Sequence, residues 1–340
     1  SSSSIDMIFC DPPYFLQLSK ELYRPDMTVV KGVSDAWDKF SSFEEYDNFT
    51  KTWLKECKRI LKENGTIWLI GTYHNIYRLG YYLQNLNFWI LNDIIWNKVN
   101  PLPNFRGTRF TNAHEIIIWA SKSKKSKYTF NYHAMKKINN DKQMRSDWNL
   151  KVCQGNERLK NNLNKTLHST QKPEELLERI ILSSTKPGDF VLDPFFGTGT
   201  TGVVCKKYSR RFIGIEKNLE YMKAAKKRIM STTPVNKANL QDYDSFKYLS
   251  KVPFKDLLKN GLINPGEKIF NSKENIRATI LANGNLRFKD KEGSIHKIGA
   301  YVQNKSACNG WTYWFVKHEN KKISINDHRN SLRELSSSKE

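Results

Sequence analysis

The residues with the clearest chemical potential stand in two short phrases, each directly after a run of apolar residues. The first phrase is Asp11-Pro12-Pro13-Tyr14, which follows the run Ile5-Asp6-Met7-Ile8-Phe9-Cys10. A carboxylate, two prolines and an aromatic ring suit the recognition of a flat base that carries an amino group. In an open α/β sheet, ligands bind at the carboxyl ends of the strands. We therefore predict a buried strand over 5–10, with Asp11 at its functional end.

The second phrase is a glycine-bearing turn, Asp193-Pro194-Phe195-Phe196-Gly197-Thr198-Gly199-Thr200-Thr201, after the run Phe190-Val191-Leu192. A helix predicted over 200–207 points its N-terminus, which favours polar and anionic groups, at the ligand. The spacing differs from the G-x-G-x-x-G of dinucleotide sites. Glu216 closes the next predicted strand, where an acid can hydrogen-bond a ribose diol. The turn and the acid together predict a nucleotide-like cofactor.

Together the two phrases predict methyl transfer from S-adenosylmethionine to the amino group of a nucleobase. An exocyclic amine is a poor nucleophile because its lone pair is delocalised into the ring. Acceptors for both N–H bonds pull the nitrogen toward a tetrahedral shape, and the Asp11 carboxylate and the Pro12 carbonyl supply two. The rings of Pro12 and Pro13 fix the backbone dihedrals and keep that carbonyl pointed. Tyr14 offers a stacking face worth about 1–3 kcal/mol.

The target base has to leave the double helix for such an attack, at a cost of a few kcal/mol. The reaction requires neither a metal ion nor a covalent enzyme intermediate. Because the same acceptors serve adenine N6 and cytosine N4, both targets stay open at this point. A DNA-binding relative that has lost catalysis is the alternative from another class.

The charge of the chain points to the same kind of substrate. The 340 residues carry a formal net charge of +22, which attracts polyanions such as nucleic acid. Residues 98–165 hold 15 Lys or Arg but only four acidic residues, so this fifth of the chain carries half of the net charge. We predict an inserted target-recognition region there. A lysine-rich proteome is the plainer explanation of the surplus.

The cysteines and the hydropathy of the chain argue against secreted, zinc-binding and membrane proteins. The five cysteines form no C-x-x-C pair, which favours small buried thiols in a reducing cytosol over disulfides or a zinc site. Neither a secretory signal sequence nor an apolar stretch of about 18 residues is apparent, so we expect neither secretion nor membrane spanning.

The apolar patterning predicts an alternation of strands and helices. Helices are expected over 43–62, 75–87, 173–184, 200–207 and 219–230, and strands over 5–10, 65–71, 93–98, 115–121, 190–193 and 212–216. Such alternation is typical of an α/β, Rossmann-like methyltransferase fold, with a mostly parallel twisted sheet and helices on both faces. Residues 122–165 are polar and weakly periodic, which fits an insertion better than core.

The chain divides into three parts by composition. We expect a catalytic domain over 1–233, a linker over 234–250 and a small accessory module over 251–335. Strand-like runs at 278–281, 294–302 and 311–316 predict an α+β or β-rich module.

The order of the two phrases resembles that of the permuted β class of DNA amino-methyltransferases, and the chain most resembles their GANTC-specific adenine methyltransferases of the CcrM and Hinf types. The resemblance covers nearly the whole chain. It includes residues 97–105 and the stretches Trp37-Asp38-Lys39-Phe40, Trp53-Leu54-Lys55-Glu56-Cys57, Arg109-Phe110-Thr111-Asn112-Ala113-His114-Glu115, His168-Ser169-Thr170-Gln171-Lys172-Pro173-Glu174 and Asn309-Gly310-Trp311.

This resemblance implies adenine N6 in duplex DNA as the target, S-adenosylmethionine as the donor and no metal. It also implies a homodimer, a C-terminal module that helps to bind the duplex, and a bacterial cytoplasmic protein at the nucleoid. Whether the enzyme is an orphan cell-cycle methylase or has a cognate restriction endonuclease for the same site stays open.

Carried over residue by residue, the resemblance assigns two sets of site residues. The catalytic set is Asp11, Pro12, Pro13 and Tyr14. The cofactor-binding set is Thr170, Gln171, Lys172, Asp193, Phe195, Gly197, Gly199, Thr200 and Glu216.

A third set is predicted to contact DNA. The candidates for base recognition are Asn100, Asn104, Phe105, Arg106 and Arg109, since Arg suits guanine and Asn suits adenine. Phosphate contacts are an equally ordinary role for the arginines. Trp37 is either a wedge inserted into the duplex or an ordinary packed side chain. Lys122, Lys124 and Lys125 belong to a basic loop that faces either phosphate or solvent.

One departure from the family concerns the beginning of the sequence. Family members carry a further strand and a Gly-Asp motif before the segment with which this sequence begins, and that piece contacts the adenine of the cofactor. We therefore expect this sequence to be truncated, with an incomplete cofactor pocket.

Overall fold

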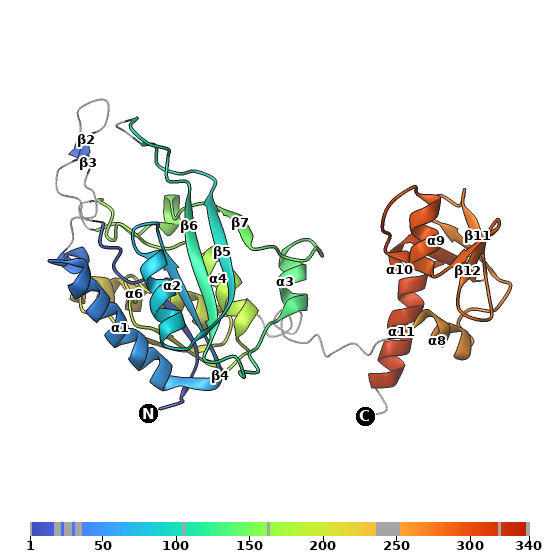
Figure 1. The fold of residues 1–340 in the computed structure, drawn as a ribbon, viewed down its shortest axis with the longest axis horizontal. Coiled ribbons are helices and arrows are strands. Elements are labelled where there is room, and N and C mark those ends of the chain that lie inside the picture. The colour runs from blue at the N-terminus through green and yellow to red at the C-terminus, as the bar shows by residue number, and fades with distance from the viewer. Residues whose placement is uncertain are drawn as a thin grey trace. The chain divides into compact units, whose positions relative to one another are not determined.

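The computed structural model describes residues 2–16, 22–23, 29–30, 36–104, 107–161, 164–235, 252–318 and 321–337. The chain forms two compact units, Ser1–Phe246 and Lys247–Glu340, which are described separately (Figure 1). The predicted linker over 234–250 lies almost wholly outside the described residues.

The first unit is built on a seven-stranded mixed sheet. Across the sheet, the strands follow the order β7 (Asp147–Leu150), β5 (Trp89–Lys98), β6 (His114–Ser121), β4 (Leu61–Gly71), β1 (Ile5–Cys10), β8 (Phe190–Asp193) and β9 (Arg211–Gly214). Only β6 runs antiparallel to its neighbours in this sheet, and the other pairs are parallel. A separate two-stranded sheet pairs β2 (Leu22–Tyr23) with β3 (Val29–Val30).

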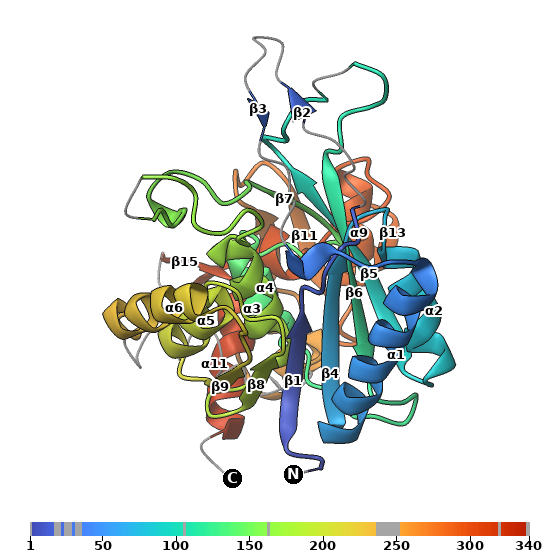
Figure 2. The same cartoon turned by 90° about the vertical axis from the view of Figure 1, so that its left-hand side faces the viewer.

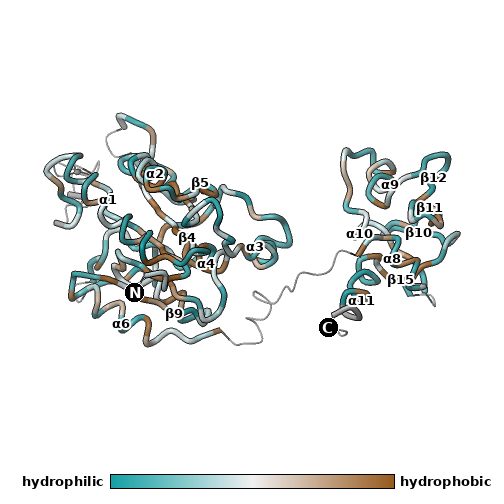
Figure 3. The backbone as a smooth tube through the Cα atoms, turned by 60° about the horizontal axis from the view of Figure 1, so that its bottom comes forward, coloured by the Kyte–Doolittle hydropathy of each residue, from teal (hydrophilic) through white to brown (hydrophobic). Residues whose placement is uncertain are grey.

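Both faces of the large sheet are buried, because successive side chains of a strand point to opposite faces. Ile8 and Cys10 of β1 pack with α1 (Phe43–Ile60) and α2 (Ile76–Asn85) on one face. Met7 and Phe9 pack with α4 (Glu174–Ser184) and α5 (Thr200–Lys207) on the other. Figure 2 shows the two groups of helices on either side of β1, and Figure 3 shows hydrophobic stretches in β4 and α4. The predicted α/β methyltransferase fold is confirmed.

The remaining short elements of this unit are α3 (Tyr132–Ile138), α6 (Leu219–Ser231) and the 3-10 turns η1 (Ala36–Asp38) and η2 (Gly155–Glu157). The helix α6 packs beside α5. Its first turn is capped by the Asn218 side chain, which accepts hydrogen bonds from the backbone of Glu220 and Tyr221.

Two strands begin four residues earlier than predicted. The strand expected from Asp93 begins at Trp89. The helix expected over 43–62 ends at Ile60, and the strand expected from Gly65 begins at Leu61. Leu61 is fully buried and pairs with Ile5 of β1, so sheet pairing overrides the local helical pattern there.

The prediction that residues 122–165 lie outside the core was also wrong in part. The helix α3 buries Ala134 and Met135, and β7 buries Trp148 and Leu150, all within the cluster on the α4 face of the sheet. The elements are too short to give a clear period in the sequence. Burial here is set by pairing of β7 with β5 and by packing of Trp148 near Trp68.

The second unit is a six-stranded antiparallel sheet with four helices among its described residues. The strands follow the order β13 (Lys291–Gly293), β12 (Leu286–Phe288), β11 (Arg277–Ile280), β10 (Lys268–Asn271), β14 (Trp314–His318) and β15 (Lys321–Ser324). The helices are α8 (Phe254–Lys259), α9 (Ile295–Val302), α10 (Gly310–Tyr313) and α11 (Ile325–Ser337).

This architecture confirms the expected α+β module but corrects two of its elements. The run 311–316, expected to be strand-like, begins in the helix α10 and enters β14 only at Trp314. The run 294–302 was expected to be strand-like and instead forms α9. Ser294 caps this helix by accepting a hydrogen bond from the Lys297 backbone. The helix packs Ile295 and Ile298 around the fully buried Trp314. The run is apolar along its length, so its pattern did not distinguish a buried helix from a strand.

The burial of β7 can be tested by truncating its tryptophan. We expect Trp148→Ala to lower the free energy of unfolding by about 3–5 kcal/mol in urea unfolding, because a buried indole leaves a cavity. The matched control is Tyr132→Ala in the same segment, where the side chain is 38% exposed. It should change stability by less than about 0.5 kcal/mol. Equally small changes in both variants would contradict the assignment of this segment to the core.

Candidate active site

The loop that carries Asp11 is held in place by a buried aspartate. The Asp38 carboxylate accepts hydrogen bonds from three successive backbone N–H groups, of Tyr14, Phe15 and Leu16, at 2.6, 2.7 and 2.9 Å. The Pro13 carbonyl accepts a further bond from the Tyr46 hydroxyl at 2.8 Å. These bonds fix the turn that follows β1.

The Pro12 carbonyl lies in this fixed turn. Among the residues that the structure describes, no hydrogen bond to the Pro12 carbonyl is found. It is therefore free to accept one from a ligand.

Asp11 is held from two sides by donors. Lys172 Nζ lies 2.8 Å from Oδ2, and the Tyr14 hydroxyl donates to Oδ1 at 2.9 Å. Burial raises the pKa of Asp11, and the Lys172 ammonium offsets much of that effect. Burial by itself lowers the pKa of Lys172, but the carboxylates of Asp11 and Glu115 outweigh it, so the net pKa is raised. Lys172 is therefore a charged partner of Asp11.

A second buried carboxylate stands behind this pair. Glu115, the second residue of β6, accepts a hydrogen bond from the Tyr14 hydroxyl at 3.1 Å and pairs with Lys98 at 2.7 Å. Burial raises its pKa, but the ammonium groups of Lys172 and Lys98 outweigh burial, and the net pKa is lowered. The only sequence signal for Glu115 was its place in the stretch 109–115, and it was not among the predicted site residues.

The glycine turn follows β8 and depends on two residues in left-handed conformations. Gly197 and Gly199 have φ values of 51° and 80°, which other residues rarely adopt. A Cβ at Gly199 would also lie 2.7 Å from the Ala225 Cβ. The turn therefore needs glycine at both positions.

Asp193, directly before this turn, is held by its neighbours. It accepts hydrogen bonds from the Thr201 hydroxyl at 2.5 Å and from the Phe195 backbone at 3.0 Å. Burial nevertheless raises the pKa of Asp193 to about 7.

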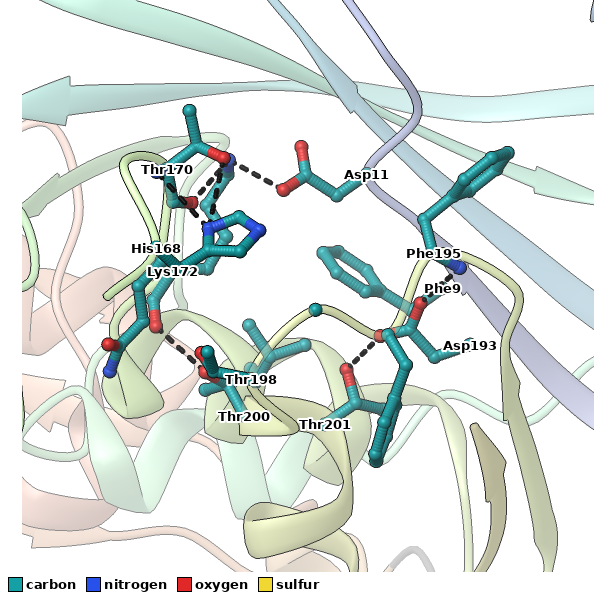
Figure 4. Close-up of a pocket in the computed structure, with 14 residues that line it drawn as sticks. Phe9, Asp11, His168, Thr170, Lys172, Asp193, Phe195, Thr198, Thr200 and Thr201 are labelled. Carbon is teal, nitrogen blue, oxygen red and sulfur yellow. Dashed lines mark hydrogen bonds and ion pairs between the residues drawn. The ribbon is translucent and has the colours of Figure 1, made fainter. Parts of the chain in front are cut away.

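A cavity that is partly open to solvent lies between this turn and Asp11 (Figure 4). Its wall includes Phe9, Asp11, His168, Thr170, Gln171, Lys172, Asp193, Phe195, Gly197, Thr198 and Thr200. Small-molecule sites combine apolar walls with a few polar groups that fix the orientation of the ligand. The acidic and aromatic lining and the backbone N–H groups at the start of α5 fit a cationic cofactor with polar ends.

A smaller cavity, also partly open to solvent, adjoins the first one. It is lined by Asp11, Pro12, Tyr14, Leu16, Trp37, Asp38 and Thr170. Asp11 and Thr170 line both cavities, so the carboxylate stands at their junction. Two ligands bound side by side would both meet Asp11.

His168 is a pocket residue outside the predicted set. Its ring lies near parallel to that of Trp37, with centroids 6.2 Å apart, and also contacts Tyr221. Burial lowers the pKa of His168 to about 4, with a further effect of the Lys172 ammonium. The ring is therefore neutral near pH 7. In the sequence His168 begins the polar run 168–172, of which only the last three residues were predicted to bind the cofactor.

Three side chains of the predicted cofactor set make contacts that the sequence did not indicate. The Gln171 side chain accepts a hydrogen bond from the Leu159 N–H at 3.0 Å and donates one to the Glu157 carbonyl at 2.8 Å. Thr200 donates to the Lys172 carbonyl at 3.1 Å. The Glu216 carboxylate accepts from the backbone of Gly197 and Asn218 at 2.8 and 2.7 Å. Glu216 does not line the larger cavity, so its contact with a ribose stays a prediction.

The loop between β5 and β6 lies at the same edge of the sheet as Asp11, and extends beyond the strands (Figure 1). Arg109 is exposed and donates to the Tyr73 hydroxyl at 2.7 Å. Asn100 is already engaged, because its amide donates to Gln154 and accepts from the Val152 backbone. Asn104 accepts a backbone bond from Gly107. Phe105 and Arg106 lie outside the described residues.

The basic loop after β6 lies at the opposite edge of the sheet. Lys122 donates through its side chain to the Leu61 carbonyl, at the start of β4, and Lys124 lies over the Trp89 ring. Because β6 is antiparallel, its start is near Asp11 and its end is far from it. The structure does not bring Lys122, Lys124 and Lys125 to the end of the sheet that carries Asp11, and their contact with DNA stays a prediction.

The described part of the chain has neither a cluster of metal ligands nor a membrane-spanning helix. No group of three or more His, Cys, Asp or Glu side chains there is arranged to hold a metal ion. No helix there is long and apolar enough to span a membrane.

Comparison with known families defines the class of this protein. The family model of DNA methylases that act on N6 or N4 amino groups matches residues 5–227, which shows that the chain belongs to this family. The model of the "Restriction Enzyme Adenine Methylase Associated" domain matches residues 235–337. The first match covers the sheet and both cavities, and the second covers the second unit.

Individual relatives narrow the class. The Type II methyltransferase M.HinfI of Haemophilus influenzae is 50% identical over 328 residues, 96% of this chain and 91% of that protein. The Type II methyltransferase M2.DpnII of Streptococcus pneumoniae is 47% identical over 234 residues, 68% of this chain and 85% of that protein.

A solved structure shares the fold. The PvuII DNA methyltransferase (cytosine-N4-specific) has a TM-score of 0.53 at 20% identity, over 72% of this chain and 85% of that chain. The likeness concerns architecture alone.

The protein is therefore a site-specific, adenine-specific DNA methyltransferase of the Hinf type that acts on duplex DNA with S-adenosylmethionine as methyl donor. The family resemblance stated from the sequence is confirmed.

The raised pKa of Asp193 gives a testable pH dependence. Between about pH 4, where an aspartate titrates in an unfolded chain, and about pH 7, the folded chain binds this proton more than the unfolded chain does. The free energy of unfolding should therefore fall as the pH rises through this window. In Asp193→Asn this contribution is absent, so the stability difference between variant and wild type should change across the window and level off above it. Parallel pH profiles of the two proteins in scanning calorimetry would contradict the assignment.

Proposed function

We propose that Asp11 and the Pro12 carbonyl are the acceptors that activate the N6 amino group of an adenine flipped into the smaller cavity. The observation that carries this proposal is the position of Asp11 at the junction of the two cavities. A base in the smaller cavity and a cofactor in the larger one would meet at this carboxylate.

The chain contributes positioning and proton acceptance to the reaction. S-adenosylmethionine, when bound, supplies an electrophilic methyl group on a sulfonium. Asp11 accepts one N–H of the target amine and the Pro12 carbonyl accepts the other, so the nitrogen lone pair points toward the larger cavity. Tyr14 and Trp37, which line the smaller cavity, supply stacking faces for the base. After transfer the amine carries one proton too many, and Asp11 is placed to take it.

The cofactor set fits the larger cavity. We assign Asp193, Phe195, Gly197, Thr200 and the segment 170–172 to cofactor binding, because they line this cavity or form its floor. Gly199 acts through the turn, since its left-handed conformation begins α5. Glu216 joins them by orienting the Gly197 backbone.

The recognised site is GANTC in this proposal. Its support is the close relation to M.HinfI over almost the whole chain, together with the family resemblance of the stretches at 97–105 and 109–115. The relation extends through the loop between β5 and β6, where base-reading side chains are expected.

The DNA surface of the first unit is assigned to the end of the sheet at which Asp11 follows β1. The loop 99–113 extends past the strands there and exposes Arg109 together with Phe110, which is 98% exposed. Trp37, which lines the smaller cavity, is 37% exposed. The three lysines Lys122, Lys124 and Lys125 are left out of this surface because they lie at the other edge.

Partners and domain roles follow from the family. The catalytic domain is assigned to 1–233 and a DNA-binding accessory module to 251–335, supported by the match of an adenine-methylase-associated domain there. A homodimer, a cognate restriction endonuclease and a nucleoid-associated cytoplasmic location complete the proposal. The names of both relatives as Type II methyltransferases support the endonuclease.

The activity is tested by methyl transfer from labelled S-adenosylmethionine to duplexes with GANTC or scrambled sites, followed by mass spectrometry of the nucleosides. We expect N6-methyladenine only in the GANTC duplex. Asp11→Ala should lower turnover by about 10³-fold or more, because it removes an acceptor used in the transition state, while duplex affinity changes little. N4-methylcytosine would reject the target, and an equal loss of turnover and affinity would reject the role of Asp11.

The DNA surface is tested by a pair of charge deletions. Arg109→Ala should weaken binding of the GANTC duplex by about 1–3 kcal/mol if the guanidinium reads a base, or flatten the salt dependence if it contacts a phosphate. Lys124→Ala is the matched control at the opposite edge and should leave both quantities unchanged. Fluorescence anisotropy across a salt series measures them. A larger effect of Lys124→Ala would place the duplex at the other edge.

A further inference from the structure

Behind the proposed catalytic pair lies a buried group of charges that touches neither cavity. Glu115 and Lys98 are 2.7 Å apart, and their side chains are 9% and 14% exposed. Neither residue lines the two cavities. They come from adjacent strands, since Lys98 ends β5 and Glu115 lies beside Trp96 near the start of β6. An ion pair in such a place costs desolvation and adds little to stability on its own.

The geometry shows what this pair faces. The Tyr14 hydroxyl lies 2.9 Å from Asp11 Oδ1 and 3.1 Å from Glu115 Oε2, so the two carboxylates compete for one proton. Lys172 Nζ lies 2.8 Å from Asp11 and 3.9 Å from Glu115. Both donors that hold Asp11 are therefore shared with Glu115.

This sharing bears on the reaction, because Asp11 has to accept a hydrogen bond from the target amine. A carboxylate saturated by a tyrosine and an ammonium is a weak acceptor for a third donor. A competing carboxylate draws part of the two donors away from Asp11. Lys98 in turn limits that competition by neutralising Glu115.

We propose that Glu115, held by Lys98, is a positioning residue that divides the donors Tyr14 and Lys172 between two carboxylates and so keeps Asp11 able to accept the target N–H. The proposal rests on the proposed role of Asp11. It extends that role to two residues that act only through Tyr14 and Lys172.

The opposite charges of Glu115 and Lys98 give the proposal a signature in the pH profile. The titratable and charged groups that face Asp11 are Tyr14 from its own loop, Lys172 from the segment before α4, Glu115 from β6, Asp193 from β8 and the adjacent Cys10. Activity requires ionised Asp11, so it is lost as the pH falls through the pKa of Asp11. The loss of activity at low pH is the acidic limb of the pH profile. A change in how Asp11 and Glu115 share the donors Tyr14 and Lys172 changes the pKa of Asp11 and so moves this limb.

The experiment measures single-turnover methyl transfer across pH for Glu115→Gln and Lys98→Met. In Glu115→Gln both donors turn to Asp11, so its pKa falls and the acidic limb should move to lower pH by about one unit. In Lys98→Met the unneutralised Glu115 draws Lys172 away, and the limb should move to higher pH. Both variants should lose rate by up to about 10²-fold at neutral pH, with KM for the duplex little changed.

Glu178→Gln is the matched control. Glu178 pairs with Lys207 at 2.5 Å between α4 and α5, away from Asp11, so its removal should leave rate and pH limb unchanged. Calorimetric binding of S-adenosylmethionine shows that each variant is folded. If Glu115→Gln does not fold, the pH profile of Lys98→Met still tests the proposal. Only a shift of its acidic limb to higher pH supports the role of Glu115.

Three results would overturn it. One is a wild-type rate in Glu115→Gln, and another is a rate loss without displacement of the acidic limb. The third is a displacement in the same direction in both variants, which a merely structural disturbance would give. If the wild-type protein showed no methyl transfer, the proposed function itself would be rejected. If Asp11→Ala were inactive while Glu115→Gln kept the wild-type rate and pH profile, only the role of Glu115 would be rejected.

Discussion

The ion pair between Asp11 and Lys172 is the interaction on which the active site depends. A carboxylate that accepts N–H bonds in a water-excluded cavity has to be ionised, and burial opposes ionisation. The ammonium 2.8 Å away offsets that penalty and joins two segments 161 residues apart in the sequence. Loss of one partner of a buried pair costs about 3–5 kcal/mol, because the other charge is left uncompensated. The pair therefore joins two walls of the larger cavity and, in the proposed role of Asp11, keeps its carboxylate ionised.

The sheet explains why these groups meet. Parallel β1 and β8 deliver Asp11 and Asp193 to one edge, and the start of α5 lies beside them. The antiparallel strand β6 delivers its first residues to that same edge, which brings Glu115 behind Tyr14. The loop between β5 and β6 emerges there too. One edge of one sheet thus carries the proposed acceptors, the glycine turn assigned to the cofactor and the loop assigned to DNA recognition.

Much of the site could be predicted because its residues follow buried strands directly. The phrases at 11–14 and 193–201 are local, and each needs only its own strand and turn. Asp38, Glu115 and His168 could not be found this way, since their contacts exist only after distant segments pack. The buried Trp148 was missed because β7 is too short to show a period, and Leu61 was assigned to a helix because its sheet partner Ile5 lies far away in sequence. The opposite placement of the lysines after β6 follows from strand direction, which composition does not reveal.

The central claim is that Asp11 stands between a flipped adenine and the methyl donor. The most direct measurement is a crystal structure of the protein with a GANTC duplex and an unreactive analogue of S-adenosylmethionine. The account predicts the target adenine in the smaller cavity, with N6 within hydrogen-bond distance of an Asp11 oxygen and of the Pro12 carbonyl, and the analogue beside Asp193 in the larger cavity. An adenine bound elsewhere on the protein, or a cofactor analogue outside the larger cavity, would contradict it.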